Sequence, residues 1–268
     1  MMAIFLSFTV PWTLSHPAAV LPLRRFSPQP LAFAALVFGS MAPDFGYHIR
    51  QVGFATFAHT LPGTVLISVP TGLMFLLIFY LVRRPVCYAF PQPHRAALLP
   101  LCAAFPRGLK RWLILLLSLL IGVWTHTFWD AWTHDGGWFV ERMPVLQRPV
   151  FRVGATVVDT AFCLQVLSSF LGLLVLAIAY FLWLRRRPAP STVDPESDRW
   201  RHFFWAGIGT ASVLIGMALA VYSAGSGHGF LLARAIVIHS AVFATDVGIP
   251  LGLIAAVIAY ARRRVDHH

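Results

Sequence analysis

The sequence predicts an all-α integral membrane protein, with about five transmembrane helices and an N-terminal pair of short helices packed in or against the bilayer. Of its 268 residues, 58% are hydrophobic and 12% are charged, whereas an average soluble domain is about half apolar and one quarter charged. So large an apolar excess cannot be enclosed in one core of this size, and lipid must therefore solvate much of it. We expect a single membrane domain over residues 1–268.

Five apolar stretches are long enough to cross a bilayer, whose hydrocarbon core requires about 20 helical residues. The predicted spans cover residues 61–82, 112–133, 157–184, 203–224 and 231–261. The last span is interrupted by Arg234, His239, Asp246 and Pro250. A polar linker that contains prolines, residues 188–198, separates the third span from the fourth.

Basic residues lie at the ends of these stretches and form no patch on a polar domain, which argues against binding to nucleic acid. Residues 83–111 carry six arginines and lysines, residues 185–202 carry five, and the tail after Ala261 carries three. Such clusters mark cytoplasmic segments, and these three segments alternate correctly with the five spans. We therefore expect a multi-pass protein with a cytoplasmic C-terminus.

Residues 14–43 are expected to form the short helical hairpin. Its two apolar runs, 14–25 and 31–42, each extend over roughly 18 Å as a helix, little more than half of the hydrocarbon thickness. Two prolines separate the runs and Pro43 ends the second. Irregular backbone at membrane depth is tolerated only where protein or a water-filled cavity covers it, so the hairpin is the first indication of a functional site.

Several ionisable residues lie at one end of the spans, where each is costly and therefore a functional candidate. His126, Asp130 and His134 follow one another at helical turns, which places all three on one helix face. His59 stands at the start of the first span, in the same leaflet by the predicted topology. From spacing alone, each can also be an interfacial residue or the partner of an arginine.

Further candidates come from the hairpin and the third span. Asp44 closes the hairpin and His48 follows one turn later. His16 precedes Pro17, a residue suited to the first turn of a helix, and Asp159 begins the third span. Imidazoles and carboxylates together are ligands of zinc, manganese and non-haem iron. The sequence therefore predicts a divalent metal site, with zinc as the expected ion and manganese or iron as alternatives.

Four motifs in the first half of the chain carry a resemblance. They are S-H-P-A within residues 8–23, G-S-M-A-P-D-F at 39–45, H-T-L-P-G within 57–63 and the H-x-x-x-D pair within 124–134. As a set they resemble an uncharacterised bacterial membrane family, a domain of unknown function, which is distantly similar to the inner-membrane metal-dependent hydrolases. The resemblance implies a location in the bacterial inner membrane and a metal-dependent hydrolytic activity.

The matching positions give the expected site. The metal ligands are expected to be His59, His126, Asp130, His16 and Asp44. His16 and Asp44 are also the candidates for catalytic roles. The residues expected to orient the ligands are His134, His48 and Asp159. The related hydrolases usually carry a second acidic residue two positions after the first, where this chain has Gly46, so a second metal would require His48 or His134 in its place. Ligand atoms of the first three should converge within about 5 Å.

The expected function is hydrolysis of a lipid or lipid-linked phosphate or ester, with membrane lipid as the partner and no nucleic acid. One alternative is an ion- or proton-coupled transporter or channel, because His239 and Asp246 share one face of the last span. Another is a b-type haem protein with His59 and His126 as axial ligands. The three cysteines show no metal or disulfide spacing, and the oligomeric state does not follow from the sequence.

Overall fold

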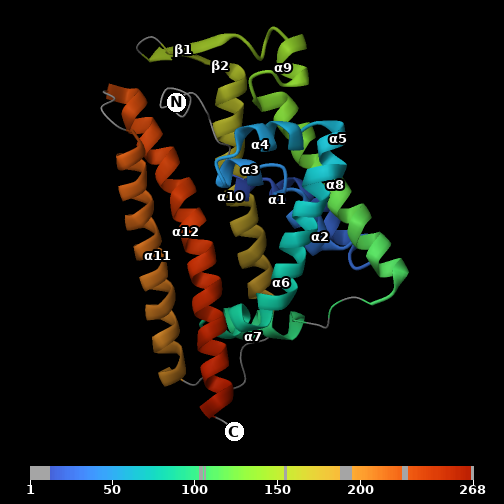
Figure 1. Ribbon diagram of the computed structural model, residues 1–268, viewed down its shortest axis with the longest axis vertical. Coiled ribbons are helices and arrows are strands. Elements are labelled where there is room, and N and C mark those ends of the chain that lie inside the picture. Colours follow the sequence, from blue (N-terminus) through green and yellow to red (C-terminus); the bar gives the residue numbers. More distant parts are fainter. Residues whose placement is uncertain are drawn as a thin grey trace. The chain divides into compact units, whose positions relative to one another are not determined.

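The computed structural model describes residues 13–102, 105, 107–153, 156–187, 195–224 and 229–266, which are mostly helical (Figure 1). The chain divides into two compact units. The first, here the α8 unit, contains Val10–Leu77 and Pro106–Tyr180. The second, here the α11–α12 unit, contains Ile78–Phe105 and Phe181–His268. The expectation of a single membrane domain stays a prediction.

The α8 unit is built mainly from short helical segments followed by long helices. Before the long helices come a 3₁₀ turn at Thr13–Ser15, α1 (Pro17–Val20), a second 3₁₀ turn at Leu21–Phe26, α2 (Phe33–Gly39), α3 (Phe45–His48), α4 (Val52–Ala58), α5 (Leu61–Gly63) and a π-helical turn at Thr64–Ser68. The longer elements and their connections are α6 (Val69–Ala89), α8 (Leu109–Thr133), α9 (Trp138–Arg142), β1 (Pro149–Val153), β2 (Thr156–Asp159) and α10 (Thr160–Arg185). The second half of α6, from Ile78, and the end of α10, from Phe181, belong to the α11–α12 unit.

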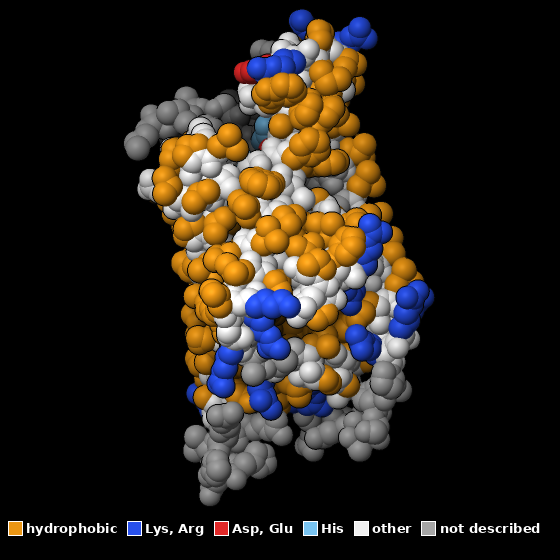
Figure 2. All heavy atoms as spheres, turned by 90° about the vertical axis from the view of Figure 1, so that its right-hand side faces the viewer, with side chains coloured by type: hydrophobic (Ala, Val, Ile, Leu, Met, Phe, Trp, Pro, Cys, Tyr) orange, Lys and Arg blue, Asp and Glu red, His pale blue; other side chains and the backbone are white. Residues whose placement is uncertain are grey.

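Five of the described helical stretches are long and apolar enough to cross a membrane. They are Leu61–Ala89, Leu109–Arg142, Thr160–Arg185, Asp198–Tyr222 and His239–Arg262. Each overlaps one predicted span, so the expected number and places of these helices are confirmed. Hydrophobic side chains are spread over the face shown in Figure 2. On α10, for example, Leu167 and Phe170 are more than half exposed.

The boundaries of the helices differ from the predicted spans, and two of the differences have a clear cause. Residues 157–159 were expected to begin the third span, but they belong to β2, which pairs antiparallel with β1. The short strands carry the β-branched residues typical of such pairs, and hydropathy alone did not separate them from the helix that follows. The first span was expected to end at Val82, but α6 continues to Ala89. Hydropathy detected the end of the apolar stretch, not the end of the helix.

The N-terminal region contains two short helical segments, as expected for the hairpin. Pro17 occupies the first turn of α1, as its sequence position predicted. The second segment ends at Gly39, before Pro43. Val20, Leu31 and Leu36 form a small core between the segments. Of the predicted polar linker, residues 188–194 lie outside the described part of the chain.

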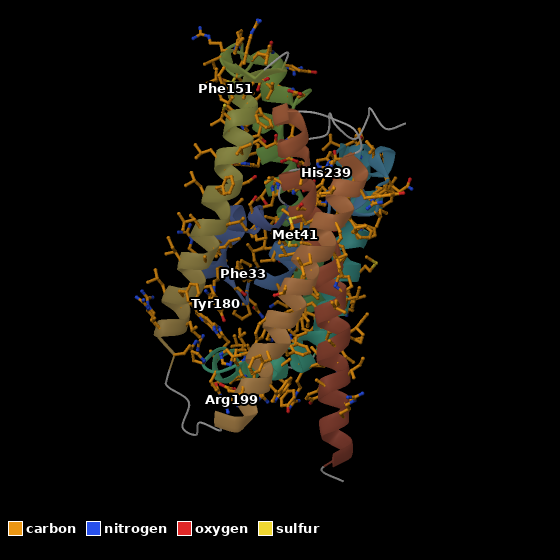
Figure 3. The ribbon with its side chains drawn as sticks, turned by 90° about the vertical axis from the view of Figure 1, so that its left-hand side faces the viewer. Phe33, Met41, Phe151, Tyr180, Arg199 and His239 are labelled. Carbon is orange, nitrogen blue, oxygen red and sulfur yellow. The ribbon has the colours of Figure 1, made fainter. Side chains whose placement is uncertain are left out.

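Helix α2 packs directly on α8, and glycines make the approach possible. A Cβ atom at Gly39 would lie 2.2 Å from the Leu119 carbonyl oxygen, and one at Gly122 would lie 2.3 Å from the Leu36 carbonyl oxygen. The Ala32 amide donates to Ser118 Oγ at 2.9 Å and fixes the start of α2. Figure 3 shows Met41 just beyond the end of this helix. The close packing holds the chain after α2 against the second half of α8.

The α11–α12 unit contains α7 (His94–Leu98), a 3₁₀ turn at Leu99–Leu101, α11 (Pro195–Ala224) and α12 (Gly229–Asp266). The last two helices lie side by side (Figure 1). Arg201 is 1% exposed and donates from Nε to the Tyr88 carbonyl at 3.1 Å. Trp205 donates to the Ala89 carbonyl at 2.9 Å. These two side chains satisfy carbonyl groups that the end of α6 leaves without helical partners.

Candidate metal centre

Helix α8 presents two predicted ligands on its buried face. No proline interrupts its sequence between Leu109 and Thr133, so the helix is continuous through the site. His126 and Asp130, one turn apart, are both buried, and His126 Nε2 lies 3.0 Å from Asp130 Oδ2. The predicted common face is therefore confirmed.

Two further predicted ligands reach the same point from short helices. His59 follows the last residue of α4, and Asp44 precedes α3. His59 Nε2 lies 3.2 Å from Asp130 Oδ2 and 3.5 Å from Asp44 Oδ1. One ligand atom from each of Asp44, His59, His126 and Asp130 lies within 4.8 Å of the others. Ligands bound to one ion at about 2.0–2.2 Å have separations of this order, so the group can hold a metal ion and the expected convergence is confirmed.

The backbone fixes which ring nitrogens point into the cluster. His126 Nδ1 lies 2.8 Å from the Ser40 carbonyl oxygen, and His59 Nδ1 lies 2.8 Å from the Ala55 carbonyl oxygen. A carbonyl only accepts, so each Nδ1 carries the proton and each neutral ring has a lone pair on Nε2. These two Nε2 atoms are 3.2 Å apart. Two lone pairs at this distance repel unless a cation lies between them.

The carboxylates add two negative charges to the same space. Asp44 Oδ1 lies 3.3 Å from His126 Nε2, and Asp44 is 0% exposed. Asp44 Oδ1 and Asp130 Oδ1 are both buried without a hydrogen-bond partner. Burial of a carboxylate is costly unless a positive charge or donors compensate it. The cluster therefore has the donor set of a cation site, which either a metal ion or protons on the imidazoles can complete.

Asp44 is positioned by a short relay of two hydrogen bonds, from His48 to Thr13 and from Thr13 to the carboxylate. Thr13 Oγ1 donates to Asp44 Oδ2 at 2.8 Å, and His48 Nε2 lies 3.1 Å from the same hydroxyl. Because the hydroxyl proton goes to the carboxylate, His48 is the donor to Thr13. His48 thus reaches a ligand indirectly, in line with its expected orienting role. Sequence reasoning missed Thr13, since a threonine near an apolar stretch carries no distinguishing signal.

Asp130 has a looser neighbour in His134. His134 Nδ1 lies 3.5 Å from Asp130 Oδ1 and 3.0 Å from Thr133 Oγ1, its hydrogen-bond partner, and the other ring nitrogen of His134 lies 2.9 Å from Gln165 Nε2. The amide donates there, which places the His134 proton on Nδ1, the nitrogen on the Asp130 side. Gln165 was missed, although a buried amide in the third span is the kind of polar residue that signals a functional site.

His16 lies beside the four-residue group. Its ring stacks on the His126 ring with centroids 3.9 Å apart, and its Nε2 lies 3.8 Å from Asp130 Oδ1 and 4.0 Å from Asp44 Oδ2. These distances exceed those of hydrogen bonds. Burial of the His16 imidazole lowers its pKa to about 4, so the ring is neutral near pH 7.

Tyr47 borders the group on another side, with its ring centroid 6.2 Å from that of His59. Burial and then the charges of Asp44 and Asp130 raise the pKa of Tyr47 to about 12. The phenol therefore keeps its proton at neutral pH and adds no further negative charge beside the two carboxylates.

Gly46 stands two positions after Asp44, where a second acidic ligand was considered. A Cβ atom at Gly46 would lie 2.5 Å from the Ala55 backbone nitrogen, so the packing of α3 on α4 excludes any side chain there. His48, one proposed substitute, contacts Thr13, and His134 contacts Gln165. The described residues thus present ligands for one ion.

Some candidates lie elsewhere. Asp159 was expected to orient a ligand, but its Oδ1 accepts from the Phe162 amide at 2.8 Å, the contact of a carboxylate that caps the start of a helix. His239, labelled in Figure 3, and Asp246 lie on α12, in the other unit. Haem ligation by His59 and His126 needs a porphyrin between the two rings. Their Nε2 atoms are 3.2 Å apart, which leaves no room for one.

Comparison with known proteins gives a family and no activity. The family described as "Domain of unknown function (DUF4184)" matches residues 10–261. No curated protein and no solved structure matches the chain. The family match includes every candidate ligand.

Proposed function

The chain belongs to the DUF4184 family, and we propose that it is a membrane-embedded, metal-dependent hydrolase of a lipid or lipid-linked phosphate or ester. The observation that carries the proposal is the pair of Nε2 atoms of His59 and His126, which face each other at 3.2 Å. Both also face buried carboxylates. One divalent cation satisfies all four groups and balances both negative charges.

The donor set favours zinc, with manganese or iron as alternatives, because all four ligand atoms are nitrogen or oxygen. The three cysteines are not part of the group. When bound there, a divalent metal polarises a phosphoryl or acyl oxygen and makes water a stronger nucleophile near neutral pH. The resemblance to inner-membrane metal-dependent hydrolases supports the same chemistry.

The residues around the cluster supply the remaining roles. His16, whose Nε2 lies 3.8 Å from Asp130 Oδ1, is the side chain placed to serve as the base for the attacking water. Thr13 holds the Asp44 carboxylate, and His134 faces the Asp130 carboxylate. Such supporting contacts fix the orientation of the ligands.

The membrane location rests on the five long apolar helices and on their exposed apolar side chains. We place the protein in the bacterial inner membrane as a multi-pass protein with a cytoplasmic C-terminus, as the basic clusters indicate. A substrate that approaches from the bilayer fits this location. The proposed partner is therefore a membrane lipid or a lipid-derived molecule.

A hydrolysis panel tests the proposal. The purified protein is assayed in detergent on long-chain phosphate monoesters, phosphatidic acid and long-chain carboxylic esters. One class should be hydrolysed, the activity should disappear with a chelator, and added zinc should restore it. Asp44→Asn removes a ligand charge with little change in volume and should reduce the rate to background, whereas the same change on α12, Asp246→Asn, should not.

Hydrolysis that persists in chelator and in Asp44→Asn would refute the proposed mechanism. Ion transport becomes the better function under a different outcome. In that case no substrate is hydrolysed, and Asp246→Asn abolishes metal or proton flux into vesicles that contain the protein.

A further inference from the structure

An apolar groove of about 290 Å³ lies beside the metal cluster, within the α8 unit. The apolar part of its wall comes from three helices: Ala18 and Ala19 of α1, Trp129 of α8, and Leu171, Gly172 and Val175 of α10. The volume is at the lower end of the range of about 300–1,000 Å³ for small-molecule sites. A slender ligand, or one part of a larger ligand, therefore fits it.

His16 joins the groove to the cluster. It lines the groove, and its ring also stacks on His126. Its Nε2 lies 3.8 Å from Asp130 Oδ1. A molecule that lies in the groove with one end against His16 therefore has that end next to the proposed metal ligands.

Besides His16, the wall carries three polar side chains, those of Ser15, Trp129 and Ser168. Trp129 Nε1 donates to Ser168 Oγ at 3.2 Å, and the Ser168 hydroxyl donates to the Gln165 carbonyl at 3.1 Å. Ser15 is buried and also interacts within the protein. Apart from His16, no ionisable side chain is among the described residues of the wall. An apolar occupant suits this lining best.

The surroundings indicate where the occupant comes from. The face of α10 beside the groove is exposed and apolar, with Leu171 49% and Val175 45% exposed. On such a helix in a membrane these side chains contact lipid tails. The cluster has a second, more polar approach, since the His59 and His134 side chains are 21% and 23% exposed. Water and a hydrocarbon chain can therefore reach the cluster by different routes.

We propose that this groove binds the hydrocarbon chain of a lipid whose phosphate or ester group lies against His16. The inference rests on the proposed function for the identity of the reacting group, but chain binding itself requires no metal. Apolar contact with the walls would position the scissile bond, and Trp129, held by Ser168, would form one side of the channel. The chain, not the headgroup, would then determine which substrates are accepted.

Photolabelling tests the site directly. The metal-free full-length protein is reconstituted in vesicles that contain a phosphatidylcholine with a diazirine at the middle of one acyl chain. Labelled peptides are identified by mass spectrometry after irradiation. Label should appear on the α1 residues Ala18 and Ala19 as well as on α10. Val175→Phe fills the groove and should reduce the α1 label about tenfold, the equivalent of roughly two lost methylene contacts.

Val166 provides a matched control on the same helix. It is exposed and lies about two and a half turns from Val175, on the opposite face of α10, so Val166→Phe should leave the α1 label unchanged. A second blocking variant, Ala18→Leu, should repeat the loss if Val175→Phe disturbs folding. Equal α1 labelling in wild type and both blocking variants would mean contact with surrounding lipid only, and would overturn the inference.

Activity separates this inference from the proposed function. With a hydrolysed substrate class in hand, Val175→Phe should raise KM about tenfold for the palmitoyl substrate and leave the butyryl analogue unaffected. If Val175→Phe reduces the α1 label but no substrate is hydrolysed by the wild type, the hydrolase proposal is refuted and the chain-binding site stands. Hydrolysis with the same chain-length dependence in wild type and Val175→Phe would refute the chain site and keep the hydrolase.

Discussion

Among the described residues, each unit contains a cluster of largely buried charged side chains, and the chemistry of the two clusters differs. In the α11–α12 unit, one terminal nitrogen of the Arg201 guanidinium lies 3.8 Å from Asp198 Oδ1, and Arg201 Nε donates to the Tyr88 carbonyl. The guanidinium also stacks over the Tyr88 ring, 4.9 Å from its centroid. In the α8 unit, two carboxylates and two imidazoles converge. No arginine or lysine is among these four residues.

The difference indicates which cluster can hold a metal ion. The Arg201 cluster contains both signs of charge, so its groups compensate one another and its role is to join α11 to the end of α6. The His–Asp cluster contains acceptors that face acceptors, with the ring protons already directed to backbone carbonyls. A buried charge alone is therefore poor evidence for a site. Converging acceptors with no arginine or lysine among them are better evidence.

The sharpest test of this contrast is metal content. His126→Ala removes a central ligand and should reduce bound zinc from one ion per chain to background, because three remaining groups with a gap hold the ion far less tightly. His239→Ala, a matched change on α12, should keep full metal content. Metal analysis of protein purified without chelator gives the result. Unchanged zinc in His126→Ala would show that the cluster is not the site.

A variant in the Arg201 cluster is expected to lower stability without changing the zinc content. Arg201→Met removes one of the two arginines beside Asp198, the other being Arg95 at 3.9 Å, and it removes the donor to the Tyr88 carbonyl. It should lower the free energy of unfolding by about 3 kcal/mol, as measured in mixed micelles. Zinc content should stay at the wild-type value. Arg199→Met, an exposed position two residues away, should change stability by at most about 0.5 kcal/mol. Loss of zinc in Arg201→Met would mean that the two clusters are coupled.

Packing beneath the metal cluster should have an intermediate effect. Gly122→Ala puts a Cβ atom 2.3 Å from the Leu36 carbonyl oxygen, which forces α2 away from α8 and should cost about 1–3 kcal/mol. The Ser40 carbonyl moves with α2, so zinc affinity should fall as well. Gly53→Ala in α4, where a Cβ meets open space, is the control. It should lower neither the free energy of unfolding nor the zinc affinity. Wild-type zinc affinity in Gly122→Ala would contradict a role for Ser40 in orienting His126.

The smallest expected effect concerns the relay behind Asp44. Thr13→Val removes the hydroxyl that donates to the carboxylate and should weaken zinc binding about tenfold, the low end for loss of a contact that supports a ligand. Thr127→Val deletes a hydroxyl that bonds only to carbonyls of its own helix and should have no effect. Competition with a chromophoric chelator measures both constants. Equal weakening in the two variants would attribute the change to general loosening of the unit.

The sequence predicted the helical spans and the main ligands for different physical reasons. Apolar stretches of sufficient length identify helices whatever their neighbours are, and ionisable residues inside them are conspicuous. The i, i+4 spacing of His126 and Asp130 was readable for the same reason. Long-range contacts were not readable: the carbonyls that fix the imidazole protons and the approach of α3 to α4 at Gly46 appear only once the chain is folded. For the same reason, the sequence did not predict the roles of Thr13 and Gln165 or the helix-capping role of Asp159.

The central claim is that His59, His126, Asp44 and Asp130 bind one divalent ion, and X-ray absorption at the zinc edge tests it most directly. Protein loaded with one equivalent of zinc should show only nitrogen and oxygen neighbours at about 2.0–2.2 Å, with the outer-shell scattering of two imidazoles. His59→Ala should reduce that scattering to one imidazole. A spectrum without imidazole scattering, or with sulfur at about 2.3 Å, would contradict the assignment.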